Sequence, residues 1–169
     1  MNLETPLQTL KFLWVKWPIT QVEFWLNRPT TGLDYFLFDF HFPATNDPSL
    51  PLGLCAFAHN STPPGYFNPY NPDILQPYES NAALFSGPIK LTSNILSVAE
   101  LQTLIGPDPT GKEYLLFTPN LNSDHQVYYD VIAVPSSGSN VGVTGTAKTS
   151  GVAPSSGGGS STNPSPPAT

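Results

Sequence analysis

The sequence predicts a mainly β protein: an antiparallel β-sandwich-like domain with one short helix, a long irregular loop and a low-complexity C-terminal arm. Six short strand-like runs alternate with turn-forming residues, which is typical of two-layer antiparallel domains. All ten Phe, seven Tyr and three Trp residues lie between Phe12 and Tyr129. We therefore expect a globular domain over residues 1–135, with the loop at 60–88 inside it, and an arm over residues 136–169.

The first two runs, 10–15 and 21–26, are separated by Trp17-Pro18. Proline cannot donate to a β ladder, so it should end the first strand. In the second run Val22, Phe24 and Leu26 alternate with polar residues and Trp25. This alternation predicts a half-buried strand.

The run at 33–42 predicts the central strand, because one of its faces is almost entirely phenylalanine, with Phe36, Phe38, Phe40 and Phe42. Each ring that is fully buried contributes roughly 1.5–3 kcal/mol of transfer free energy. The next run, 52–58, is apolar throughout and has no polar face, which predicts a strand covered on both sides.

Residues 60–88 contain many prolines and no evident element, which predicts a long irregular loop. The loop is rich in aromatic residues, and this favours an ordered excursion that packs on its own domain or on a neighbour. Tyrosine at low charge density suits a protein interface. The candidate interaction residues are therefore Tyr66, Phe67, Tyr70 and Tyr78.

One helix is predicted at 97–105, where Ser97 and Glu100 have the spacing of a capping box. Gly106-Pro107 should end this helix. The runs at 113–118 and 127–134 predict a closing hairpin. After it, 25 of the 34 residues from 136 to 169 are Gly, Ser, Thr or Pro. This composition predicts a flexible arm whose removal leaves the melting temperature of the domain nearly unchanged.

Charge and hydropathy narrow the range of expected partners and of expected locations. Only 11% of residues are charged, the net charge is −6, and the six Lys and Arg residues are scattered singly. Without a basic stripe, neither nucleic acid nor an anionic membrane surface is an expected partner. The sequence shows no Sec signal peptide and no transmembrane segment. Low charge is common in virion and surface proteins, so we expect a virion or an extracellular or surface assembly.

No catalytic, cofactor-binding or metal site is predicted. Asp39 and His41, joined by His59 or by Asp124-His125, are the best metal-site candidates, but their spacing matches no named zinc motif. Cys55, the only cysteine, lies in an apolar run and is expected to be a buried thiol. The segment 106–112 ends in Gly-Lys, but its prolines and its position after a helix do not suit phosphate binding.

These features together predict a non-enzymatic structural protein that needs no cofactor. We expect a subunit of the cement or decoration type found on virion capsids, oligomeric in context, whose partners are other protein subunits. The alternative is a ligand-binding β-domain such as a carbohydrate-binding module, with Trp14, Trp17, Trp25 or the loop from Tyr66 to Tyr78 as the stacking platform. A small hydrolase would require a nucleophile and a base that the sequence does not suggest.

Overall fold

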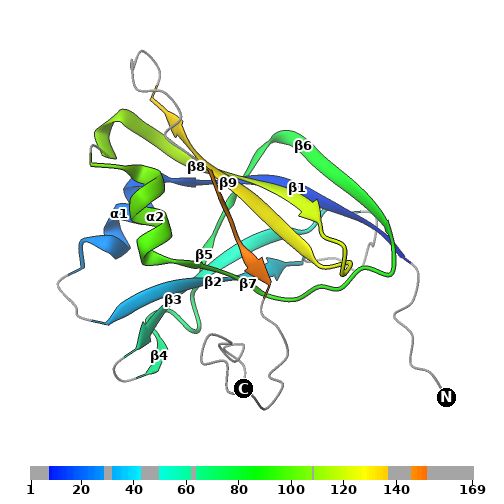
Figure 1. The fold of residues 1–169 in the computed structure, drawn as a ribbon, viewed down its shortest axis with the longest axis horizontal. Helices are drawn as coiled ribbons and strands as arrows, with labels where there is room; N and C mark the ends of the chain where they lie inside the picture. Colours follow the sequence, from blue (N-terminus) through cyan, green and yellow to red (C-terminus); the bar gives the residue numbers. More distant parts are fainter. Residues whose placement is uncertain are drawn as a thin grey trace.

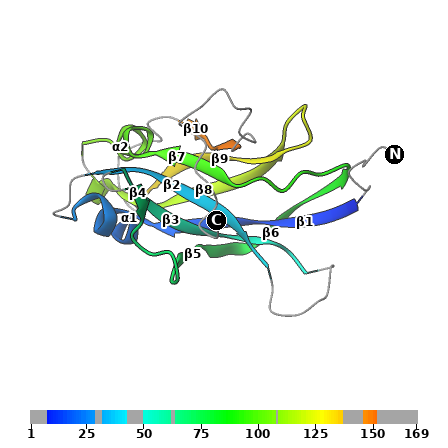
Figure 2. The same cartoon turned by 90° about the horizontal axis from the view of Figure 1, so that it is seen from below.

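The computed structural model describes residues 8–28, 32–42, 50–61, 64–107, 109–136 and 146–151. They form two antiparallel sheets packed face to face, with both helices at one end (Figures 1 and 2). The five-stranded sheet A has the order β10 (Thr146–Lys148), β9 (Val127–Pro135), β8 (Lys112–Leu121), β1 (Gln8–Pro18) and β6 (Gln76–Gly87).

The six-stranded sheet B has the order β11 (Ser150–Gly151), β7 (Asn94–Ser97), β2 (Leu33–His41), β3 (Gly53–Ser61) and β4 (Pro64–Tyr66), and β5 (Asp73–Ile74) also pairs with β3. The prediction of a mainly β, sandwich-like fold is confirmed. None of the helices in the described part of the chain has the length and apolar character that a membrane span requires.

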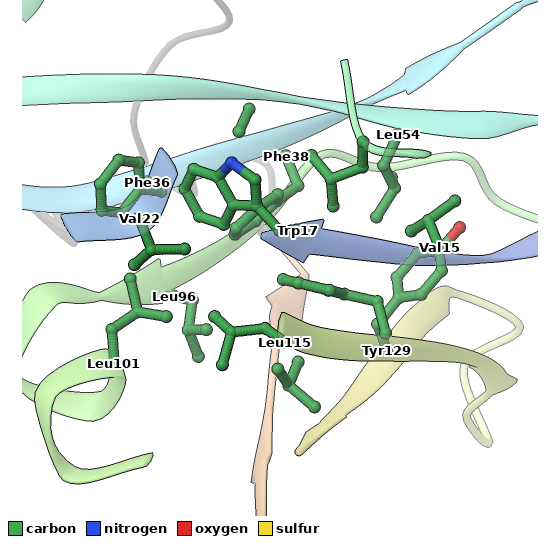
Figure 3. Packing of buried hydrophobic residues seen from close by; sticks show 14 of the residues in the cluster. Val15, Trp17, Val22, Phe36, Phe38, Leu54, Leu96, Leu101, Leu115 and Tyr129 are labelled. Carbon is green, nitrogen blue, oxygen red and sulfur yellow. The ribbon is translucent and has the colours of Figure 1, made fainter. Parts of the chain in front are cut away.

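The core lies between the two sheets, and its largest side chains are aromatic (Figure 3). Trp17 of β1 packs edge-on against Phe36 and Phe38 of β2, with ring centroids 5.0 and 5.8 Å apart. Phe36, Phe38 and Phe40 are buried as the alternation in β2 predicts. Phe42 follows the last residue of β2 and is 60% exposed, so it does not share their environment.

The prediction of a strand at 21–26 is wrong, because helix α1 spans Ile19–Leu26. Ile19, Val22 and Trp25 are buried, and their three-residue spacing is that of one helix face. Phe24, which the strand prediction places on the buried face, is 59% exposed. No side chain caps the start of α1, so the sequence lacked the usual start signal.

The prediction of an irregular loop over 60–88 is also wrong for most of its length, since this region contains β4, β5 and the twelve-residue β6. Pro77 is tolerated because β6 is an edge strand with one unpaired side. The ladder between β1 and β6 contains a bulge: Leu13 pairs with Ala82 and Val15 with Pro77, so residues 78–81 oppose a single residue of β1.

The prediction of helix 97–105 is confirmed by α2 (Val98–Ile105) and its capping box. The backbone N–H of Glu100 donates to the hydroxyl of Ser97 over 3.1 Å, and the backbone N–H of Ser97 donates to the Glu100 carboxylate over 3.2 Å. Gly106 ends the helix with a φ of 77°, which glycine adopts without strain. The predicted hairpin is present as β8 and β9.

Part of the predicted arm belongs to the sandwich. Thr146–Lys148 pairs with β9 of sheet A, and Ser150–Gly151 pairs with β7 of sheet B, so this sheet-bridging segment, residues 146–151, joins the two layers (Figure 1). Thr149 lies buried between its two strands. Residues 137–145 and 152–169 of the predicted arm lie outside the described residues.

Candidate interaction surfaces

The outer face of sheet A carries an aromatic cluster formed by Trp14, Tyr78 and Tyr114, which come from β1, β6 and β8. The ring centroids of Trp14 and Tyr78 are 6.4 Å apart, and those of Tyr78 and Tyr114 are 5.9 Å apart. The ammonium group of Lys16 lies 5.3 Å from the Tyr114 ring, a cation–π contact. We call these four residues the sheet A aromatic cluster.

The bulge in β6 places Tyr78 in this cluster and strains the next residue. Glu79 has a φ of 54°, which is uncommon for a residue with a Cβ atom. Burial, together with the hydrogen bond to Tyr78, raises the pKa of Tyr114 to about 12, and the charges of Glu113 and Glu79 act in the same direction. The cluster therefore combines three aromatic faces with one cation, and the carboxylates of Glu79 and Glu113 lie near it.

A second aromatic group lies on the outer face of sheet B. The Tyr35 ring stacks on His59 at 4.2 Å, and the Tyr66 ring meets His59 edge-on at 5.1 Å. Nδ1 of His59 lies 2.8 Å from a carboxylate oxygen of Asp34. Burial, followed by the hydrogen bond to Tyr66, raises the pKa of Tyr35. Beside these rings lies a small buried cluster, separate from the main core, that consists of Leu37, Cys55 and Phe57.

A third group joins α1 to the segment after β4. Phe67 stacks against Trp25 at 6.2 Å, and the Arg28 guanidinium lies 4.9 Å from the centre of the Phe67 ring. The indole N–H of Trp25 donates to the carboxylate of Asp73 over 2.7 Å. Phe67 therefore packs the segment onto α1, and Asp73 adds a charge-assisted hydrogen bond from Trp25.

The four residues proposed from the sequence as an interaction site do not form one surface. Tyr66 lies on sheet B, Phe67 packs against α1, and Tyr78 lies on sheet A. Tyr70 is 97% exposed and stands apart from these ring contacts. Trp14 and Tyr78 come together, whereas Trp17 is fully buried in the core and Trp25 is 7% exposed.

The residues weighed as metal ligands are also dispersed. His59 pairs with Asp34, and the Asp39 carboxylate accepts hydrogen bonds from the backbone N–H of Phe40 and the hydroxyl of Ser93. His125 lies in the exposed turn between β8 and β9. Within the described residues, no three His, Cys, Asp or Glu side chains are grouped closely enough to hold a metal ion.

Cys55 is buried, as its apolar neighbours predict. Burial, and to a lesser extent the Asp39 charge, raises the pKa of its thiol to about 11. A thiol with a raised pKa is a poor nucleophile at neutral pH. In the segment 106–112, Pro109–Gly111 forms a short 3-10 helix and Lys112 is buried at the start of β8, so this lysine is not presented as a phosphate ligand.

A shallow hollow lies between the ends of α1 and α2. Glu23, Asn27 and Gln102 are its polar lining residues, and Ile105 and Pro109 contribute apolar surface. Among the described residues that line the hollow, Glu23 is the single ionisable one. The hollow therefore lacks the second titratable group that general acid–base catalysis at a paired site requires.

The feature that the sequence prediction missed is the free edge of sheet A. β6 pairs with β1 on one side and is the last strand of its sheet (Figure 1). The strands at the other ends of the two sheets, β10, β11 and β4, have only three, two and three residues. Thus β6 is the one long edge strand among the described residues. The short apolar run from Ala82 to Phe85 was its sequence signal, hidden by the surrounding prolines.

The molecule is thus a β-sandwich-like protein whose distinctive surface features are grouped aromatic rings and one long free strand edge. Comparisons with protein-family models, with curated proteins and with solved structures find no match to the chain.

Proposed function

We propose that this chain is a non-enzymatic structural protein that stabilises an assembly through contacts with other protein subunits, as cement and decoration proteins do on virion capsids. The observation that supports the proposal most is the free edge of β6 over residues 81–87. This stretch contains neither a charged residue nor a proline. Natural proteins usually protect such an edge with charges, prolines, bulges or a covering element.

The two halves of β6 differ in the features that discourage further strand pairing. Its first half contains Pro77, the strained Glu79 and the bulge at 78–81, all of which discourage further strand pairing. Its second half has none of these features. Leu84, at the centre of that half, is 63% exposed. An edge that none of the described strands pairs with is suited to bind an extended strand of another chain through main-chain hydrogen bonds.

The proposal is tested by native mass spectrometry of the assembly that contains the chain. We expect the chain as a stoichiometric subunit, and we expect Leu84→Lys to reduce its incorporation strongly. Phe24→Lys is the matched control, because Phe24 is 59% exposed and lies on α1, away from the edge. A chain recovered alone, or equal incorporation of the two variants, would contradict the proposal.

A carbohydrate-binding function is the second candidate, and the sheet A aromatic cluster favours it. Trp14, Tyr78 and Tyr114 lie side by side, and the carboxylates of Glu79 and Glu113 lie close to Tyr114. Aromatic faces with polar groups at their border suit the apolar face and hydroxyl rim of a sugar ring. A glycan array with the native chain and with Trp14→Ala tests this, since only the native chain should bind.

A further inference from the structure

We propose that two copies of this chain pair through the free edges of their β6 strands, antiparallel and centred on Leu84, so that two five-stranded sheets become one continuous sheet. This inference rests on the proposed function, since it names a partner for the same edge. Its evidence is the direction of the backbone groups, the side-chain pattern and the charge distribution along residues 81–87.

The backbone of β6 presents its free groups at the required positions. The N–H of Leu52 donates to the carbonyl of Lys11, and the N–H of Leu13 donates to the carbonyl of Leu52, both over 2.9 Å. The main-chain groups of Lys11 and Leu13 therefore point away from β6, and those of Phe12 point toward it. Along an antiparallel ladder, hydrogen-bonded and non-hydrogen-bonded pairs alternate.

The partners on β6 follow from this alternation. Phe12 pairs with Ala83 as a hydrogen-bonded pair, whereas Lys11 pairs with Leu84 as a non-hydrogen-bonded pair. The N–H and C=O groups of Leu84 therefore point to the open side of β6, and those of Ala82 and Ser86 do the same. These are the groups that a second strand needs.

A pairing centred on Leu84 is consistent with this geometry. Leu84 then faces Leu84 of the second copy as a hydrogen-bonded pair, and Ala82 faces Ser86 in the same way. On the core side, Ala83 faces Phe85, whose ring already packs against Phe12 with centroids 5.6 Å apart. Each large side chain other than the central leucine therefore meets a small one, and cross-strand packing of this kind stabilises a ladder.

Charge repulsion does not oppose the pairing of the two β6 strands. The bulge in β6 limits the length over which they can pair. No residue from 81 to 87 is charged. Lys11, which is next to Leu84, would lie three strand spacings from its counterpart, roughly 14 Å at about 4.8 Å per strand. This separation exceeds the Debye length of about 8 Å at physiological ionic strength. The bulge at 78–81 ends the regular edge on one side, so the register has a natural limit.

The first test measures the oligomeric state of the full chain by analytical ultracentrifugation. We expect a concentration-dependent dimer. Leu84→Lys and Leu84→Glu should each be monomeric, because each places two like charges directly opposite one another, and an equal mixture of the two should recover the dimer as a heterodimer. Phe24→Lys should leave the dimer intact. A monomeric native chain at every concentration, or a dimer unaffected by both substitutions, would overturn the proposal.

Three further variants test the pairing and its register, and they show whether a lost dimer reflects a loss of folding. Leu84→Pro removes an N–H that points outward, so it should leave the circular dichroism spectrum native and abolish the dimer. Leu84→Cys in a Cys55→Ala background should form an intermolecular disulfide, since facing Cα atoms of a hydrogen-bonded pair lie about 5.5 Å apart, within disulfide range. Ser86→Cys in the same background should not form it, because Ser86 faces Ala82.

The experiments distinguish failure of the proposed pairing between copies from failure of the proposed structural function. If the native chain is monomeric but Leu84→Lys still loses its place in a heteromeric assembly, pairing between copies is overturned and the structural function stands. If the native chain dimerises through Leu84 but is not part of any larger assembly, the dimer stands and the structural function is overturned.

Discussion

Two polar atoms inside the sandwich have no hydrogen-bond partner among the described residues: Nε1 of Trp17 and the hydroxyl of Tyr129. Both side chains are fully buried. Burial removes water from a polar group, and without a new partner this costs about 1–3 kcal/mol. The ring of each residue nevertheless contributes a large apolar area, so the net effect of these residues on stability is the sum of opposing terms.

This balance predicts that Tyr129→Phe stabilises the protein. The substitution removes the unpaired hydroxyl and keeps the ring, so the free energy of unfolding should rise, by about 1 kcal/mol. Urea denaturation of the native chain and the variant measures it. Tyr35→Phe is the control, because its hydroxyl is hydrogen-bonded to Tyr66, and it should lower stability. A loss of stability in Tyr129→Phe would show that the hydroxyl has a partner.

The sequence predicts the burial of single residues well inside a strand with clear alternation. It predicts their burial poorly at the end of a strand. Phe36, Phe38 and Phe40 are buried because β2 is central and one of its faces meets sheet A. Phe42 has the same phase in the sequence, but it follows the end of β2 and is exposed. The exact end of a strand depends on its neighbours' lengths, which no local pattern contains.

At the scale of elements, the sheet-bridging segment joins the two layers of the sandwich. The side-chain N–H groups of Asn94, which is fully buried, donate to the carbonyls of Thr92 and Val127, and its oxygen accepts from the hydroxyl of Thr149 over 3.1 Å. The backbone N–H of Tyr129 donates to the same hydroxyl over 2.8 Å. One short segment thus connects β7 of sheet B with β9 of sheet A.

This network predicts different effects for two truncations. Ending the chain at Ser136 removes β10, β11 and Thr149, so the melting temperature should fall, contrary to the expectation from composition alone. Ending it at Gly151 keeps both strands and should leave the melting temperature near that of the full chain. Thr149→Val should reproduce part of the first effect, about 1–3 kcal/mol, because it leaves buried groups of Asn94 and Tyr129 unpaired. Equal melting temperatures for both truncations would contradict this role.

The wrong predictions for α1 and β6 have the same cause: a local sequence pattern does not include the packing and pairing partners of the segment. Residues 19–26 fit a period of two through Val22, Phe24 and Leu26, and also a spacing of three through Ile19, Val22 and Trp25. Only packing against the core decides between the two patterns. In β6, prolines favour a loop in isolation, but pairing with β1 along the edge offsets that preference.

At the scale of the whole molecule, composition predicts the class of fold but not the surfaces. The sheet A aromatic cluster forms because β6, β1 and β8 are neighbours, although Trp14, Tyr78 and Tyr114 are far apart in the sequence. Strand order is a long-range property that no local pattern specifies. The same holds for the free edge, since a strand is an edge only when the order of the entire sheet is known.

The thiol of Cys55 and the phenols of the buried and half-buried tyrosines together predict a loss of stability in alkaline solution. Burial raises the pKa of Cys55 from 9.0 to about 11 and, with the hydrogen bond to Tyr78, that of Tyr114 from 10.0 to about 12. Burial also raises the pKa values of Tyr35, Tyr66 and Tyr129. Each group therefore keeps its proton in the folded protein at a pH where the unfolded chain has released it.

The direction of this pH dependence follows from the linkage between proton binding and folding. Where the folded state binds more protons than the unfolded state, the free energy of unfolding decreases as pH rises. The stabilisation from these groups is complete below pH 9 and should be lost progressively from pH 9.0 to about 11 for Cys55 and from 10.0 to about 12 for Tyr114. Urea midpoints measured across this range test it. Cys55→Ala should flatten the lower part of the curve, and Tyr114→Phe the upper part. A midpoint that stays constant or rises through this range would show that these groups are not buried as the fold requires.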